Sequence, residues 1–228
     1  MELLSVIVGA IIGAVPTLVG SFVLQERMWK QTRRKEAIDV VYGPLFAEVN
    51  RLQERAVRWD VLDFDEIVKI MEHYRYFLVD GKTRDSVNLI VSLARHYNQL
   101  RKACEGPANR IAREQVKREL QEETSDIKYR MFFEDQFIDI VSLEDAMIRG
   151  KTPKELLEER NPAINIKYVQ FEALLEGRPV DIRFADMASE TAVNNFKAEN
   201  IFQRLRLTQL NILDHSDNVI NQIRSKIA

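Results

Sequence analysis

The stretch at residues 3–25 reads LLSVIVGAIIGAVPTLVGSFVLQ and contains no charged residue. As a helix its 23 residues would extend about 34 Å, enough to cross a hydrocarbon core of ~30 Å. Only a helix spans lipid as a single segment, because every backbone N–H and C=O must find its partner internally. We therefore expect residues 1–25 to form a transmembrane anchor, bent at Pro16. The two alternatives are a buried core helix of a soluble protein and a cleaved signal peptide. A signal peptide would carry positive charge before the apolar run, where this chain has only Glu2.

A basic segment follows the apolar run directly. The five basic residues, which we call the basic collar, stand against one acid, Glu26; they are Arg27, Lys30, Arg33, Arg34 and Lys35. Such a cluster keeps its side of the membrane in the cytoplasm, and Trp29 stands where an aromatic belt residue is expected. We expect residues 26–43 to form a juxtamembrane helix that contacts lipid headgroups, with the N-terminus outside the cell and the body in the cytoplasm.

Small residues recur every four positions along the expected anchor. This stripe consists of Ser5, Gly9, Gly13, Thr17 and Ser21, and Gly9 with Gly13 forms a GxxxG motif. Small residues at this spacing let two membrane helices approach closely. The stripe predicts a homo-oligomer.

The rest of the chain, residues 44–228, is expected to form one all-α cytoplasmic domain, an antiparallel bundle of long helices. Gly and Pro are scarce, 8 and 6 residues, which argues against a loop-rich β protein. The apolar spacing predicts helices over residues 45–58, 64–79, 83–104 and 142–150 and one beginning at Thr152. An Asp63–Glu66 capping box would open the second, and Asp80–Gly81 would stop it. We expect a break or bend at Gly106–Pro107, and extended connections rather than a β-pair over residues 160–185.

The last predicted helix is long, from residue 186 to residue 226. A heptad-like seam runs along it, through Ala198, Phe202, Leu205, Ile212, Val219 and Ile223. Seams of this kind pack against other long helices in bundles and coiled coils.

No stretch of the sequence matches a catalytic, cofactor or metal motif. A single cysteine, Cys104, cannot form an intramolecular disulfide, and His215 lacks a second ligand or a nucleophile at helical spacing. Residues 36–228 carry a net charge of −5, which argues against nucleic-acid binding. We expect no enzyme activity and no cofactor. A site assembled from distant helices would leave no local motif and stays an alternative.

One segment resembles other proteins. Residues 42–48 read YGPLFAE, and the order anchor, basic collar and Tyr-x-Pro-Leu-x-x-Glu resembles many short prokaryotic proteins anchored at their N-termini. This resemblance covers about the first fifty residues. It implies the same topology and a helical body, and it carries no active site.

These features together predict a single-pass membrane protein that acts as a helical scaffold or interaction protein. Its expected partners are the lipid bilayer, a second copy of itself and a further protein. The stripe also allows a membrane-damaging effector of a defence or toxin system, in which assembly of the body would gather the anchors into a leak.

Overall fold

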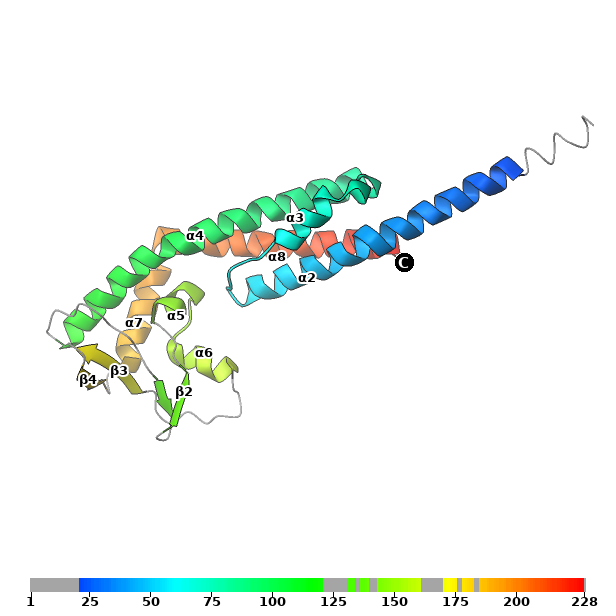
Figure 1. Ribbon diagram of the computed structural model, residues 1–228. Helices are drawn as coiled ribbons and strands as arrows, with labels where there is room; N and C mark the ends of the chain where they lie inside the picture. Colours follow the sequence, from blue (N-terminus) through cyan, green and yellow to red (C-terminus); the bar gives the residue numbers. More distant parts are fainter. Residues whose placement is uncertain are drawn as a thin grey trace, which may run out of the picture. The chain divides into compact units, whose positions relative to one another are not determined.

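The computed structural model describes residues 21–120, 131–133, 136–139, 143–160, 170–175, 178–182 and 185–227. Helices account for most of these residues, which confirms the expectation of a helical body (Figure 1). The chain divides into two compact units. Unit 1 takes residues up to Arg51, Phe64–Asn88 and Asp217–Ala228, and unit 2 takes Leu52–Asp63 and Leu89–Ser216.

Unit 1 begins with a helical run that has no break. Residues 21–37 are helical, the π-helix η1 covers Ile38–Tyr42, and α2 covers Gly43–Val57. The wide turn lies just before Pro44, which has no N–H to donate and whose ring crowds the carbonyl four residues back. The Gly43 N–H reaches the Ile38 carbonyl instead, so the ladder widens to the π register and continues. The expected boundary between the juxtamembrane helix, residues 26–43, and the helical body is therefore a π-helical turn within one helical run.

The next helix of unit 1 is shorter than predicted. α3 covers Asp65–Glu72, and the 3-10 helix η2 covers Tyr74–Leu78. The residue before α3 is Phe64, whose side chain gives no capping hydrogen bond, so the helix begins one residue later than an Asp63 capping box would place it. The change of direction occurs at His73, which is extended and whose Nδ1 accepts the Arg75 N–H at 3.3 Å. A local bond of this kind competes with continuation of the helix.

The long helix α4 covers Gly81–Leu120 and passes through Pro107. Of the predicted break or bend at Gly106–Pro107, the break was therefore wrong, since the helix continues to Leu120. Cys104, Ala108 and Ile111 are buried, so one apolar face continues across the proline. Burial of that face offsets the hydrogen bond that Pro107 cannot make.

Unit 2 adds three shorter helices to its part of α4. They are α5 (Leu143–Arg149), α6 (Pro153–Arg160) and α7 (Ala185–Lys197). The predicted start at Thr152 is confirmed, since the Thr152 N–H donates to Glu155 Oε2 at 2.6 Å and the Glu155 N–H donates to Thr152 Oγ1 at 3.2 Å. The two bonds satisfy reciprocal N-terminal donors as a capping box.

Unit 2 also contains a small antiparallel sheet. Its strands lie in the order β2-β1-β3-β4 and comprise β1 (Met131–Phe133), β2 (Gln136–Asp139), β3 (Gln170–Leu175) and β4 (Arg178–Ile182). β3 and β4 pair from Phe171 with Ile182 to Leu175 with Arg178. The prediction of extended connections over residues 160–185 was therefore wrong for β3 and β4. These two short runs pair as antiparallel strands, and the pairing satisfies their backbone N–H and C=O groups.

The C-terminal helix is interrupted where one continuous helix was predicted. α7 ends at Lys197 and α8 covers Asn200–Ile227. Ala198 lies in the turn between them and is exposed, so its place in the seam was wrong. The turn is closed by hydrogen bonds from the Ala198 N–H to Asn195 O and from the Glu199 N–H to Phe196 O.

Within the described residues, no helix has both the length and the apolar character that a bilayer crossing requires. Residues 1–20 of the predicted anchor lie outside the described part of the chain, and residues 21–25 are helical.

Candidate functional site

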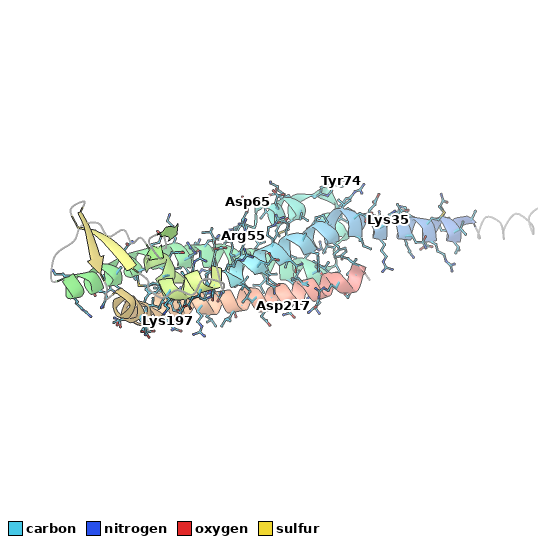
Figure 2. The ribbon with its side chains drawn as sticks, turned by 90° about the horizontal axis from the view of Figure 1, so that it is seen from below. Lys35, Arg55, Asp65, Tyr74, Lys197 and Asp217 are labelled. Atoms are coloured by element: carbon cyan, nitrogen blue, oxygen red, sulfur yellow. The ribbon has the colours of Figure 1, made fainter. Side chains whose placement is uncertain are left out.

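The first helix of unit 1 extends beyond the elements that pack against its C-terminal part (Figure 1). Every residue from 21 to 35 is exposed. Five of them are large apolar residues: Phe22, Val23, Leu24, Met28 and Trp29. Packing begins at Glu36, which pairs with Arg75 of η2 at 3.4 Å, and at the buried Ala37. Figure 2 shows Lys35 where the helix leaves the other elements.

The basic collar lies on this exposed segment. The Arg33 guanidinium stacks on the Trp29 ring, 3.6 Å from its centroid, and Lys30 pairs with Glu26 at 2.7 Å. Among the described residues, no carboxylate lies within ion-pair distance of Arg33 or Arg34. The collar therefore presents cationic groups beside exposed apolar side chains, the mixture found where a helix meets a membrane interface.

A pocket of about 400 Å³ lies at the base of the collar, within unit 1. We call it the collar pocket. Its walls come from the first helix, η2, the residue before α4 and the end of α8: Arg33, Arg34, Ala37, Ile38, Tyr42, Leu78, Asp80, Ser225 and Lys226. Three basic side chains face one acid, so the lining has a formal charge of +2. The sequence analysis found the first-helix cations but not Lys226, since nothing in the sequence indicates that the chain's end returns to the collar.

Asp80 organises one wall of the collar pocket. Its carboxylate accepts the Thr83 N–H at 3.1 Å and the Thr83 hydroxyl at 2.8 Å, which caps the N-terminus of α4. The Tyr42 hydroxyl donates to Asp80 Oδ2 at 3.2 Å, and Lys226 Nζ lies 3.8 Å from the same oxygen. Asp80 was predicted to stop the preceding helix; it serves chiefly to start the next one.

The charge of Asp80 is held by these partners. Burial alone would raise its pKa, but the two Thr83 hydrogen bonds, the Lys226 charge and the Tyr42 hydroxyl together lower it below the ordinary 3.8. Burial raises the pKa of Tyr42, so its hydroxyl stays protonated. Asp80 is thus an anion with its hydrogen bonds supplied inside the fold.

A second charged cluster, in unit 2, was not predicted as a group. Arg149 donates to Asp145 at 2.8 Å, to Asp60 at 3.1 Å and to the Arg58 carbonyl. Arg101 donates to Asp145 at 3.2 Å and to the Trp59 carbonyl at 3.1 Å. The two arginines hold the turn after α2, where Trp59 has φ of 60° and stacks on Phe202 at 5.8 Å. With both carboxylates paired, this cluster stabilises the turn.

The remaining predicted residues fall into two groups. Phe202, Leu205 and Ile212 are buried in unit 2, and Val219 and Ile223 are buried in unit 1. Ser21 is exposed on the first helix, while Ser5, Gly9, Gly13 and Thr17 lie outside the described residues.

The structure places the cysteine and histidine candidates, Cys104 and His215, on α4 and α8. Cys104 is fully buried, and burial raises the pKa of its thiol to about 11. His215 is half-buried on α8. In the described ranges, no three His, Cys, Asp or Glu side chains are grouped to hold a metal ion.

No family model, curated protein or solved structure matches this chain.

Proposed function

We propose that the chain is a single-pass membrane protein that presents its helical body at the cytoplasmic surface as a scaffold for protein interaction. Residues 3–25 would cross the bilayer, and the basic collar would lie among the headgroups of the inner leaflet. The homo-oligomer would form through the small-residue stripe.

The observation that supports this proposal best is the exposure of residues 21–35. In this segment Phe22, Leu24 and Trp29 expose 70%, 63% and 55% of their surfaces, although the helix continues directly into the packed part of unit 1. Isolated exposed apolar residues are ordinary, but five large ones within residues 21–29 of one helix favour an apolar surrounding. Basic residues begin at Arg27, beside Met28 and Trp29, and continue to Lys35, which is the mixture expected at a membrane boundary.

Membrane integration is tested by extraction at alkaline pH. We expect the full chain to stay in the membrane pellet, and Ile11→Asp with Ile12→Asp to release it, since each acid at mid-bilayer costs about 2.5–3.5 kcal/mol. The matched control places the same two acids at Leu207 and Leu210 of α8, which are 61% and 51% exposed. A wild-type chain recovered in the soluble fraction would contradict the anchor.

Orientation is tested by labelling with a membrane-impermeant maleimide. The buried Cys104 gives little background, so a cysteine at Glu2 and one at the exposed Ser92 of α4 can be compared. We expect Glu2→Cys to react in intact cells and Ser92→Cys only after permeabilisation. The reverse pattern would place the body outside the cytoplasm.

Self-association is tested by replacing the stripe glycines. We expect Gly9→Leu with Gly13→Leu to shift the detergent-solubilised chain toward the monomer, because two large side chains prevent close helix approach. Ala10→Leu with Ala14→Leu adds bulk about 100° around the same helix and serves as the control. Equal sedimentation of all three proteins would exclude the stripe as the interface.

A further inference from the structure

The collar pocket has the lining that a phosphate group requires. Arg33, Arg34 and Lys226 supply cationic N–H donors from two segments almost 200 residues apart in sequence. Arginine forks and lysine ammonium groups are the usual protein partners of phosphate oxygens. Among the described residues, neither arginine has a carboxylate partner within the fold, so their donors stay available to a ligand.

The one acid in the collar pocket does not cancel this preference. Asp80 accepts two hydrogen bonds from Thr83 and one from Tyr42, and it lies 3.8 Å from Lys226. Its lone pairs are therefore directed largely into the fold, and two positive charges of the lining remain in excess. An isolated phosphate diester carries one negative charge and a monoester up to two, which this excess can neutralise.

The apolar part of the lining adds a second requirement. Ala37, Ile38 and Leu78 stand beside the cations, and Ala37 is only 6% exposed. A ligand that places a phosphate against the arginines would bring its neighbouring atoms against these side chains. This combination favours a phosphate ester with an apolar portion over inorganic phosphate.

We propose that the collar pocket binds the phosphate group of an anionic phosphate ester, with the ester's apolar portion against Ala37, Ile38 and Leu78. The same chemistry is offered by an anionic phospholipid headgroup and by a free phosphate ester. The lipid source rests on the proposed membrane anchor, since a pocket at the base of the collar would then open at headgroup level. Binding itself does not depend on that anchor.

The test measures heat of binding to the full chain in an uncharged detergent at about 0.15 M salt, where exposed charges more than ~8 Å apart are largely screened. The probes are dihexanoyl phosphatidylglycerol below its micellar concentration, glycerol 3-phosphate, and dihexanoyl phosphatidylcholine. We expect saturable binding of the first and much weaker binding of the zwitterionic third. Glycerol 3-phosphate binding as tightly as the lipid would identify a free ester as the source of the phosphate and would refute the contact of an apolar portion with Ala37, Ile38 and Leu78. Binding of none of them, or equal binding of both lipids, would overturn the proposal.

Variants locate the binding. We expect Arg34→Gln and Lys226→Gln each to weaken binding about five-fold, the value of one basic contact to a headgroup. Lys35→Gln removes the same charge from the adjacent position, about 100° around the helix and outside the lining, and should change binding less than two-fold. Equal losses in all three would indicate general attraction to the collar and refute the pocket.

A variant that is expected to bind more tightly serves as a control, because misfolding can weaken binding but cannot strengthen it. Asn caps helices about as well as Asp, so Asp80→Asn keeps an acceptor for the Thr83 N–H while removing the negative charge. We expect it to tighten binding about five-fold; unchanged or weaker binding would contradict the proposed charge logic. Because the assay is in detergent, its failure leaves the membrane proposal standing, and release of the chain at alkaline pH leaves the pocket standing.

Discussion

Gly150 and Gly106 offer a sharp contrast, because the same change to alanine should act in opposite directions. Gly150 ends α5 with φ of +66°, and a Cβ built there would lie 2.8 Å from the Phe202 ring atom Cζ. Gly106 lies inside α4, and a Cβ there meets nothing within 4 Å.

The expected magnitudes follow from these two environments. A side chain at left-handed φ costs about 1–2 kcal/mol, and displacing a packed ring adds about 1–3 kcal/mol. Phe202 also stacks on Trp59 and meets Phe196 edge-on at 5.5 Å, so its ring has little freedom to move. We expect Gly150→Ala to lower the free energy of unfolding by about 2–5 kcal/mol. Gly106→Ala should raise it by about 1 kcal/mol through helix propensity.

Thermal unfolding followed by circular dichroism in detergent measures both effects. For a chain of this size about 1 kcal/mol shifts Tm by roughly 2–4 °C, so Gly150→Ala should melt at least about 4 °C below the wild type and Gly106→Ala slightly above it. Phe202→Leu, combined with Gly150→Ala, removes the ring contact and separates it from the backbone strain. Shifts of the same sign for both alanine variants would refute the reasoning.

Three further outcomes are expected. Cys104 should react with a thiol reagent at pH 8 at least about a hundred-fold more slowly in the folded chain than after denaturation. The reason is that burial makes the thiol inaccessible and raises its pKa to about 11. Equal rates would place Cys104 at the surface. The stabilisation from ionised Asp80 should be complete above the pKa of Asp80 in the unfolded chain and should be lost as the pH falls through its lower pKa in the folded chain. The Tm difference between the wild type and Asp80→Asn should therefore change between about pH 5 and pH 2 and be constant above about pH 5. A change confined to neutral pH would implicate another group. Arg149→Ala should destabilise by about 2–4 kcal/mol because it removes the arginine that pairs with Asp60 and one of the two arginines that pair with Asp145. Arg110→Ala, whose side chain is 55% exposed, should cost under about 1 kcal/mol by denaturant titration, and similar values for the two variants would show that the arginine cluster of unit 2 adds no more than a surface pair.

Local signals in the sequence predicted the features that depend on neighbouring residues. The capping box at Thr152 and Glu155 formed as expected, and α5 ends at Arg149, followed by Gly150 with its positive φ, the usual residue at a helix C-terminus. The apolar face of α4 follows the predicted spacing, with Val87, Ile90 and Ala94 buried. In each case the residues that determine the feature lie within a few helical turns of one another in the sequence.

The errors came where distant parts of the chain compete with local preference. Pro107 looked like a break, but the buried face that continues past it stabilises the helix more than one lost hydrogen bond destabilises it. Ala198 fits a heptad by spacing, yet the chain turns there and exposes it. The collar pocket could not be predicted from the sequence for the same reason, because Lys226 and Asp80 are far apart in sequence and come together only in the folded chain.

The π-helical turn at Ile38–Tyr42 has a mechanical consequence. The helical backbone is continuous from residues 21–37 through η1 into α2. We therefore expect a rotation of residues 21–37 about the helix axis to rotate α2 as well. A flexible linker at the same position would not transmit such a rotation. We therefore expect residues 21–42 to be stiff, with the widened turn at Ile38–Tyr42 held by the hydrogen bond from the Tyr42 hydroxyl to Asp80, the residue before α4.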